Sequence, residues 1–122
     1  MPKKAIGSGG GAPYSPAIQA GNLVFVSGQV GSDPVTRQLP PDVESQTRVC
    51  LERIKTVLGQ AGTTMENVVR TNVYLANIAD FQKMNGVYRT FFTGVLPART
   101  TVQAALSAPE YLVEIDAVAL AE

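Results

Sequence analysis

Histidine is absent from this sequence of 122 residues, and cysteine occurs once, as Cys50. Without histidine, the Ser-His-Asp and Cys-His catalytic schemes are excluded, and no zinc or iron site is expected. One cysteine permits no disulfide within the chain, which is typical of a protein from the reducing cytosol. Any acid–base chemistry must therefore use carboxylates, tyrosine, lysine, the backbone or water.

Long apolar runs and net charge are also lacking. No run of about 18 apolar residues occurs, so no membrane-spanning segment is expected, and the opening MPKKAIGSGGG lacks the apolar region of a secretory signal. Ten basic residues balance ten acidic ones, whereas nucleic-acid binding needs a basic surface. We therefore expect a cytoplasmic protein with neither a nucleic-acid nor a membrane partner.

The composition is that of one globular domain. Hydrophobic residues make up 45% of the chain, and a chain of this length can bury a core without disulfides or metals. Residues 1–122 are therefore expected to form a single domain. The glycine-rich stretch GSGGGAP predicts a loop, and residues 1–12 are expected to be flexible.

A hairpin is predicted after this loop. The stretch AIQAGNLVFVSGQVG reads as strands at Ala17–Ala20 and Leu23–Ser27, joined by a Gly-Asn turn. The proline-rich connection that follows leaves room for a short extra strand near Val35–Arg37.

Two amphipathic helices are predicted. Asp42 is a suitable N-cap for a helix that runs to about Ala61, with Gly62 as its cap. Cys50 falls on the apolar stripe of this helix and is expected in the core. The stretch ADFQKMNGVYRTFF predicts a second helix whose core-facing residues are Phe81, Met84, Tyr88, Phe91 and Phe92.

Three more strands complete the expected order β-β-α-β-α-β-β. The stretch NVVRTNVYLAN alternates, and the other two strands are expected at Thr100–Leu106 and Leu112–Leu120. Two helices on one face of a sheet give an α+β sandwich. The other face keeps apolar residues such as Leu112 and Val118, so we expect a partner subunit to cover it. The residues of NVVRTNVYLAN predicted to share one face are Val69, Thr71, Val73 and Leu75.

Charged residues lie within these apolar strands, where they are costly unless paired or used. Arg99 enters one strand, and its guanidinium suits either a carboxylate ligand or a structural ion pair with Glu114 or Asp116. Glu114 shares a face with Asp116. It is a candidate acid–base group whose surroundings favour a raised pKa, or else an ion-pair or solvent-facing residue. A structural role is favoured for Asp116.

Weaker candidates lie elsewhere. Tyr14 follows the glycine loop, and its side chain either covers a pocket or packs against other side chains of the protein. Ser27 precedes Gly28 and Gly31, which let backbone amides approach a ligand closely. Asn85 stands before a glycine inside the second helix, a locally unfavourable pair that marks either a functional site or close packing.

Four segments occur together in order: PYSPAIQAGNLVFVSGQVG, NVYLANIADFQKMNGVY with FF close behind, LPARTTV and VEIDAVA. Together they resemble the RidA family of YjgF-like reactive-intermediate deaminases, from about Ala12 onward. The resemblance implies a chorismate-mutase-like α+β fold and a homotrimer with pockets at the subunit interfaces. It also implies hydrolysis of 2-imino and 2-enamino acids, such as 2-aminoacrylate released by pyridoxal-phosphate enzymes, to 2-keto acids and ammonia, without a cofactor or metal.

The resemblance also assigns roles. It makes Arg99 the carboxylate ligand and Glu114 the acid that orients water. Thr101 stands where this branch usually has cysteine, which puts substrate preference and rate in question more than activity. Backbone groups near Thr101 and Gly31 are candidates for holding water or substrate. The remaining pocket residues implied by the resemblance are Tyr14, Ser27, Gly28 and Asn85.

Two other functions stay open from the sequence. The trimer is either a catalyst or a module that binds small carboxylates or a protein partner without turnover, and retention of Arg99 favours catalysis. An endoribonuclease or translation-inhibitor role, which is attributed to some relatives, is disfavoured by zero net charge and the absence of histidine.

Overall fold

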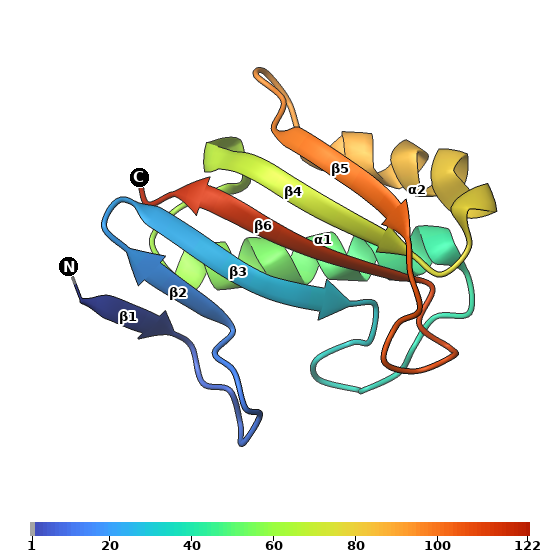
Figure 1. The fold of residues 1–122 in the computed structure, drawn as a ribbon, viewed down its shortest axis with the longest axis horizontal. Coiled ribbons are helices and arrows are strands. Elements are labelled where there is room, and N and C mark those ends of the chain that lie inside the picture. The colour runs from blue at the N-terminus through green and yellow to red at the C-terminus, as the bar shows by residue number, and fades with distance from the viewer. Residues whose placement is uncertain (1) are drawn as a thin grey trace.

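The structure, a computed structural model that describes residues 2–122, is a two-layer α+β sandwich (Figure 1). A six-stranded mixed sheet has the order β1-β2-β3-β6-β4-β5, with only β4 and β5 parallel. The strands are β1 (Lys3–Ile6), β2 (Ala17–Ala20), β3 (Leu23–Val30), β4 (Val68–Leu75), β5 (Ala98–Gln103) and β6 (Val113–Leu120). The helices are α1 (Val43–Gln60) and α2 (Phe81–Tyr88), with short 3-10 turns η1 (Met65–Asn67), η2 (Ile78–Asp80) and η3 (Arg89–Phe91).

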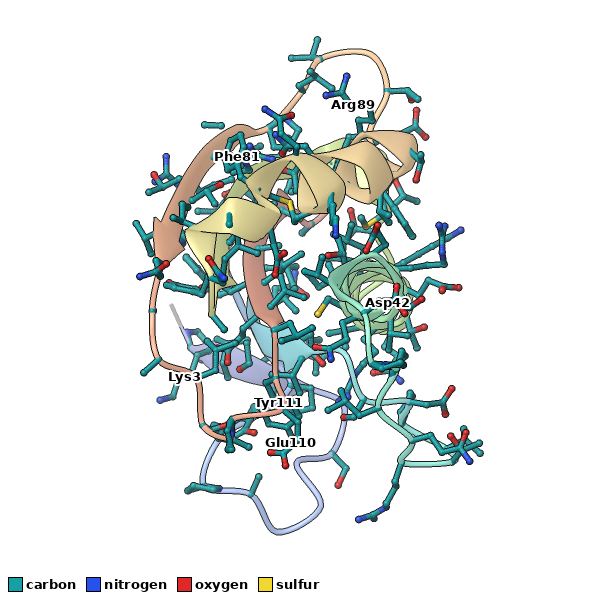
Figure 2. All side chains as sticks on the ribbon, turned by 90° about the vertical axis from the view of Figure 1, so that its right-hand side faces the viewer. Lys3, Asp42, Phe81, Arg89, Glu110 and Tyr111 are labelled. Carbon is teal, nitrogen blue, oxygen red and sulfur yellow. The ribbon has the colours of Figure 1, made fainter. Side chains whose placement is uncertain are left out.

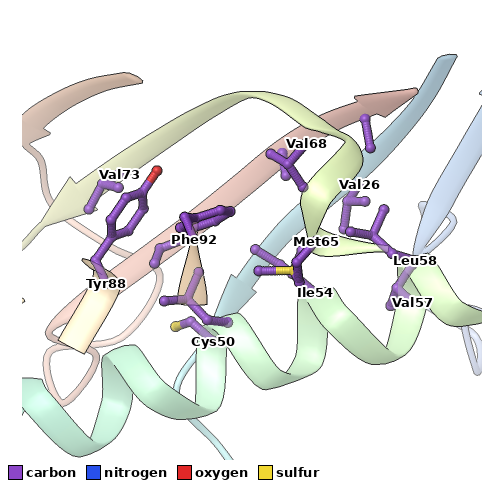
Figure 3. Packing of buried hydrophobic residues seen from close by; sticks show 14 of the residues in the cluster. Val26, Cys50, Ile54, Val57, Leu58, Met65, Val68, Val73, Tyr88 and Phe92 are labelled. Atoms are coloured by element: carbon purple, nitrogen blue, oxygen red, sulfur yellow. The ribbon is translucent and has the colours of Figure 1, made fainter. Parts of the chain in front are cut away.

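Both α-helices cover the same face of the sheet, as the sequence predicts (Figure 1). None of the helices formed by residues 2–122 is long and apolar enough to cross a bilayer. The helix-facing residues of the central strand β6 are almost completely buried, and α1 and α2 pack against each other over this core. Figure 3 shows Cys50 and Ile54 of α1 within this core. These β6 residues are Val113, Ile115, Ala117 and Ala119.

The predicted boundaries of α1 are confirmed. The Asp42 carboxylate accepts a hydrogen bond of 2.8 Å from the Ser45 amide, and that bond lowers the pKa of Asp42. At the other end Ala61 is the cap residue, and Gly62 follows it with a φ of 80°. Glycine adopts this left-handed backbone without the steric cost that other residues meet.

The N-terminal segment is the first correction. Residues 1–12 were expected to be flexible, yet β1 pairs with β2 in an antiparallel register that aligns Lys3 with Ala20 and Ile6 with Ala17. Ile6 is buried and supplies an apolar anchor. The edge of β2 has backbone N–H and C=O groups without partners, and β1 forms hydrogen bonds with them. This pairing joins segments that are distant in the sequence, so the local composition of residues 1–12 does not predict it.

Two further strand predictions are wrong. Val69 was expected to share the face of Thr71 and Leu75, which are buried, but Val68 is buried instead and Val69 is exposed, because the β4–β6 register shifts between Val68 and Arg70. The expected strand at Val35–Arg37 is a turn instead. The Asp33 carboxylate accepts hydrogen bonds from the next amides, those of Val35 and Thr36, and closes the turn.

The second face of the sheet is uncovered in this chain. It exposes apolar side chains from several strands, with Phe25 44% and Val102 42% accessible. Val118 lies on this face opposite Phe25 in the register, as expected, whereas Leu112 packs against the core instead. The uncovered face is therefore an apolar surface available to another chain.

The reactivity of the Cys50 thiol provides a test of how α1 packs against the sheet. Its side chain is fully buried, and burial raises the pKa of the thiol to about 12. We expect the thiol of the native protein to react with a disulfide reagent at pH 8 at least about 100-fold more slowly than in denaturant, because the thiolate is scarce and inaccessible. A native rate equal to the denatured rate would contradict this packing.

Candidate functional site

Arg99 is held on β5 by the helix layer. It pairs in register with buried Thr71 of β4 and therefore points to the face that α2 covers. The Arg99 Nη1 donates a hydrogen bond of 2.7 Å to the Asn85 Oδ1. Its guanidinium carbon lies 4.7 Å from the ring centre of Tyr88 and 5.5 Å from that of Phe81. These contacts orient the guanidinium and spread its charge over two π faces.

The spacing of α2 explains this arrangement. Phe81, Asn85 and Tyr88 are four and three residues apart, so they share one face of the helix; Figure 2 shows Phe81 at the start of α2. The sequence predicted Tyr88 as a core residue but did not predict that its ring also supports the guanidinium of Arg99. The signal available in the sequence was its position three residues after Asn85.

Tyr88 is itself fixed in place. Its hydroxyl lies 2.7 Å from the Thr71 hydroxyl, and its ring centre is 4.7 Å from that of Phe92 (Figure 3). Burial raises the pKa of Tyr88, so the phenol stays neutral. A neutral, immobile ring is a suitable support for a guanidinium.

A hollow of about 300 Å³ opens beside this guanidinium, and we call it the arginine hollow. Arg99 is half-buried, and among residues 2–122 its Nε and Nη2 take part in no hydrogen bond. Two parallel N–H groups match the two oxygens of a carboxylate. The lining residues are Asn85, Tyr88, Arg89, Phe92, Leu96, Pro97 and Arg99.

A second hollow, of about 630 Å³, contains Glu114 and is called the glutamate hollow. It brings together four of the predicted site residues, which come from the glycine loop, β3 and β6. A Cβ atom built at Gly28 would overlap the Glu114 carboxylate, whose Cδ would lie only 2.9 Å away. Glycine is therefore required for this close approach. The residues that line this hollow include Tyr14, Ser27, Gly28, Arg53, Tyr111 and Glu114.

Burial is the main cause that raises the pKa of Glu114, and the negative charge of Asp116 adds to it. The Asp116 carboxylate accepts hydrogen bonds from the Asn72 amide, at 2.8 Å, and from the Tyr74 hydroxyl, at 3.2 Å. Asp116 is thus tied to β4, in agreement with the structural role expected for it. Glu114 holds its proton to higher pH than an ordinary glutamate, which suits proton exchange.

Two of the predicted site residues, Ser27 and Gly31, make contacts within the chain that stabilise the fold. The Ser27 hydroxyl donates a hydrogen bond of 2.6 Å to the Ser15 carbonyl, which ties β3 to the loop that carries Tyr14. Tyr14 itself is 62% exposed. Gly31 lies outside both hollows, and a Cβ atom there would overlap Gln46 of α1. Its glycine thus permits close helix packing, and no contact of Gly31 supports the predicted binding role.

Thr101 lies two residues after Arg99 on the same face of β5, in register with Val73. It does not line either hollow. Its hydroxyl is buried and has no hydrogen-bond partner among residues 2–122. Buried hydroxyl groups are normally satisfied, so this one has unused hydrogen-bonding capacity beside the arginine.

The side chains of Arg99 and Glu114 point to opposite faces of the sheet, although Arg53 of α1 also lines the glutamate hollow. Arg99 faces the helices, whereas Glu114 pairs with Tyr74 and faces the uncovered side together with Asp116. The alternative of a structural ion pair between Arg99 and either acid is wrong within residues 2–122, where Arg99 bonds to Asn85 instead. One chain thus places the guanidinium of Arg99 and the carboxylate of Glu114 on opposite faces of its sheet and does not bring them together.

Comparison with known proteins identifies the family of this chain. Residues 6–121 match the protein family described as Endoribonuclease L-PSP. This chain belongs to the YjgF/RidA family. A mouse relative named 2-iminobutanoate/2-iminopropanoate deaminase is 41% identical over 109 residues, which span 88% of this chain and 81% of the mouse protein.

Two Escherichia coli relatives extend the comparison. A protein of strain K12 that is also named 2-iminobutanoate/2-iminopropanoate deaminase is 33% identical over 111 residues, or 88% of this chain and 87% of that protein. The crystal structure of TdcF with bound serine superposes with a TM-score of 0.89 at 31% identity, covering 96% of this chain and 98% of TdcF. The RidA-family fold predicted from the sequence is thus confirmed.

The contact between Gly28 and Glu114 gives a test of this RidA-family site. In Gly28→Ala the carboxylate must move away from the added methyl group toward water, so we expect the pKa of Glu114, followed by carboxyl carbon NMR, to fall toward its ordinary value. Gly86→Ala is the matched control, because nothing lies within 4 Å of a Cβ atom there.

The control should raise the free energy of unfolding by about 1 kcal/mol, since alanine favours the helix, and should leave the pKa of Glu114 unchanged. An unaltered pKa in Gly28→Ala would show that the carboxylate does not rest against residue 28.

Proposed function

We propose that this chain hydrolyses 2-imino and 2-enamino acids of the 2-aminoacrylate type to 2-keto acids and ammonia. The observation that carries the proposal is Arg99, whose guanidinium is oriented by Asn85 and Tyr88 while two of its nitrogens remain available. Every substrate of this class has a carboxylate next to the reacting carbon. The names of the mouse and Escherichia coli relatives support the same chemistry.

The complete site is proposed to form between two copies of the chain within a homotrimer. Arg99 and Glu114 lie on opposite faces of one sheet, so a ligand that touches both must lie between chains. The uncovered apolar face supports such an assembly, because an exposed surface of this kind favours burial against a partner. Head-to-tail contacts that close into a ring make identical pockets, each with one arginine and one glutamate.

In the proposed mechanism, Arg99 binds the substrate carboxylate and fixes the position of C2. The protonated C2=N bond is already electrophilic, so a water molecule oriented by the Glu114 carboxylate adds its oxygen to C2 and gives its proton to that carboxylate. The nitrogen of the resulting carbinolamine takes that proton from the Glu114 carboxyl, and the hydroxyl group then gives its own proton to the Glu114 carboxylate. The C–N bond then breaks, which yields the keto acid and neutral ammonia, and the proton held by Glu114 converts the ammonia into an ammonium ion.

An enamine substrate needs one earlier step. Glu114 in its protonated form donates a proton to C3, which converts the enamine into the imine without any change of oxidation state. The raised pKa of Glu114 supports this role, since it keeps a larger fraction of the group protonated near neutral pH.

A coupled assay tests the reaction. An amino-acid oxidase generates the imine, and the appearance of keto acid is followed with and without the protein. We expect acceleration by the wild type and a loss of about 100-fold or more in Arg99→Ala, because two charge-assisted hydrogen bonds disappear. Arg48→Ala, an exposed arginine of α1, should retain full activity. Carboxylate binding without acceleration would instead support a non-catalytic binding module.

Mixing two inactive variants tests whether the site is shared. In a randomly mixed assembly of Arg99→Ala and Glu114→Gln chains, about one quarter of the interfaces unite an intact arginine with an intact glutamate. We expect recovery of about that fraction of wild-type activity after joint refolding. If both residues of each site came from the same chain, no activity would return.

A further inference from the structure

The glutamate hollow contains a second arginine that the proposed reaction does not use. Arg53 extends from α1, is half-buried, and lines this hollow together with Glu114 and Tyr111. Its Nη1 donates hydrogen bonds of 2.8 Å to the Ser32 carbonyl and 3.1 Å to the Ser32 hydroxyl. One nitrogen of the guanidinium is thus anchored to the chain just beyond β3.

The other nitrogens of Arg53 are unoccupied. Among residues 2–122, Nε and Nη2 take part in no hydrogen bond, and no hydrogen bond joins Arg53 to a carboxylate. Asp33 and Glu52 line the adjoining cavity with Arg53. The Asp33 carboxylate is committed to the amides of its own turn, which are the main cause that lowers its pKa. Nε and Nη2 form the side of the guanidinium that binds a carboxylate through two parallel bonds.

One carboxylate lines the hollow, that of Glu114, and a second, that of Asp116, lies on the same strand outside the lining. Glu114 and Asp116 lie on the same face, and their mutual repulsion contributes to the raised pKa of Glu114. A ligand with a second negative charge would meet the same repulsion unless a cation offsets it. Arg53 is the arginine that lines this hollow, while Arg99 serves the α-carboxylate from the other face of a neighbouring chain.

We propose that Arg53 forms a subsite for a second carboxylate on the substrate side chain, so that this chain favours dicarboxylic 2-imino acids such as 2-iminosuccinate. The inference rests on the proposed deaminase function for the position of the α-carboxylate and C2. With Arg99 at one end and Glu114 beside C2, the side chain extends into the glutamate hollow toward Arg53. An uncharged substrate side chain leaves Arg53 hydrated and gains no binding energy from it.

The test compares 2-iminosuccinate with 2-iminobutanoate, each generated in place by an amino-acid oxidase. We expect the ratio of their kcat/KM values to fall about tenfold or more in Arg53→Gln, since a charge-assisted contact is lost for the dicarboxylic substrate alone. Arg53→Lys keeps the charge and should retain part of the preference. Arg48→Gln, from the same helix but lining a different cavity, should leave the ratio unchanged.

Binding of the products separates this inference from the proposed reaction. Titration calorimetry with oxaloacetate and 2-oxobutanoate should show an affinity advantage for oxaloacetate that Arg53→Gln removes, whether or not any imine is hydrolysed. Equal effects of Arg53→Gln on both ligands, in a variant whose thermal unfolding matches that of the wild type, would overturn the subsite. Turnover of 2-iminobutanoate with an unchanged substrate ratio would overturn it while leaving the deaminase intact.

Discussion

The alternation of side chains along the central strand β6 is the constraint on which the site depends. Val113, Ile115 and Ala117 are buried against the helices, and successive side chains of a strand point to opposite faces. Glu114 and Asp116 are therefore forced onto the uncovered face, next to the polar side chains of β4. A shift of one residue would place both carboxylates in the core, where their desolvation would be costly.

The same alternation divides the chemistry between the faces. Arg99 lies under α2 because it shares the face of Thr71, and the aromatic ring of Tyr88 and the amide of Asn85 hold it there. The guanidinium of Arg99 is thus held in one orientation, and a held group loses less entropy on binding a ligand. Glu114 lies on the uncovered face, so the proposed assembly and the proposed catalysis depend on one feature of the sheet.

The family description refers to an endoribonuclease, but the physical character of this chain favours a small anionic ligand. Basic and acidic residues balance at ten each, whereas RNA-binding surfaces draw their affinity from many phosphate contacts. The arginine hollow, of about 300 Å³, has the size of a small-molecule site. The positively charged residues that line this hollow are Arg89 and Arg99. Two arginines suit one carboxylate rather than an extended phosphate backbone.

Local pattern alone determined the two helices, the hairpin, the burial of Cys50 and the separation of Glu114 from the core, because period and capping are properties of neighbouring residues. The motifs also marked Arg99, Asn85, Tyr14 and Gly28 as candidate site residues. Tertiary structure decided the rest: the pairing of β1, the shift that buries Val68, the support of Arg99 by Tyr88, and the placement of Arg99 and Glu114 on opposite faces. These features depend on register between distant strands and on contacts across the layers, which no stretch of adjacent residues specifies.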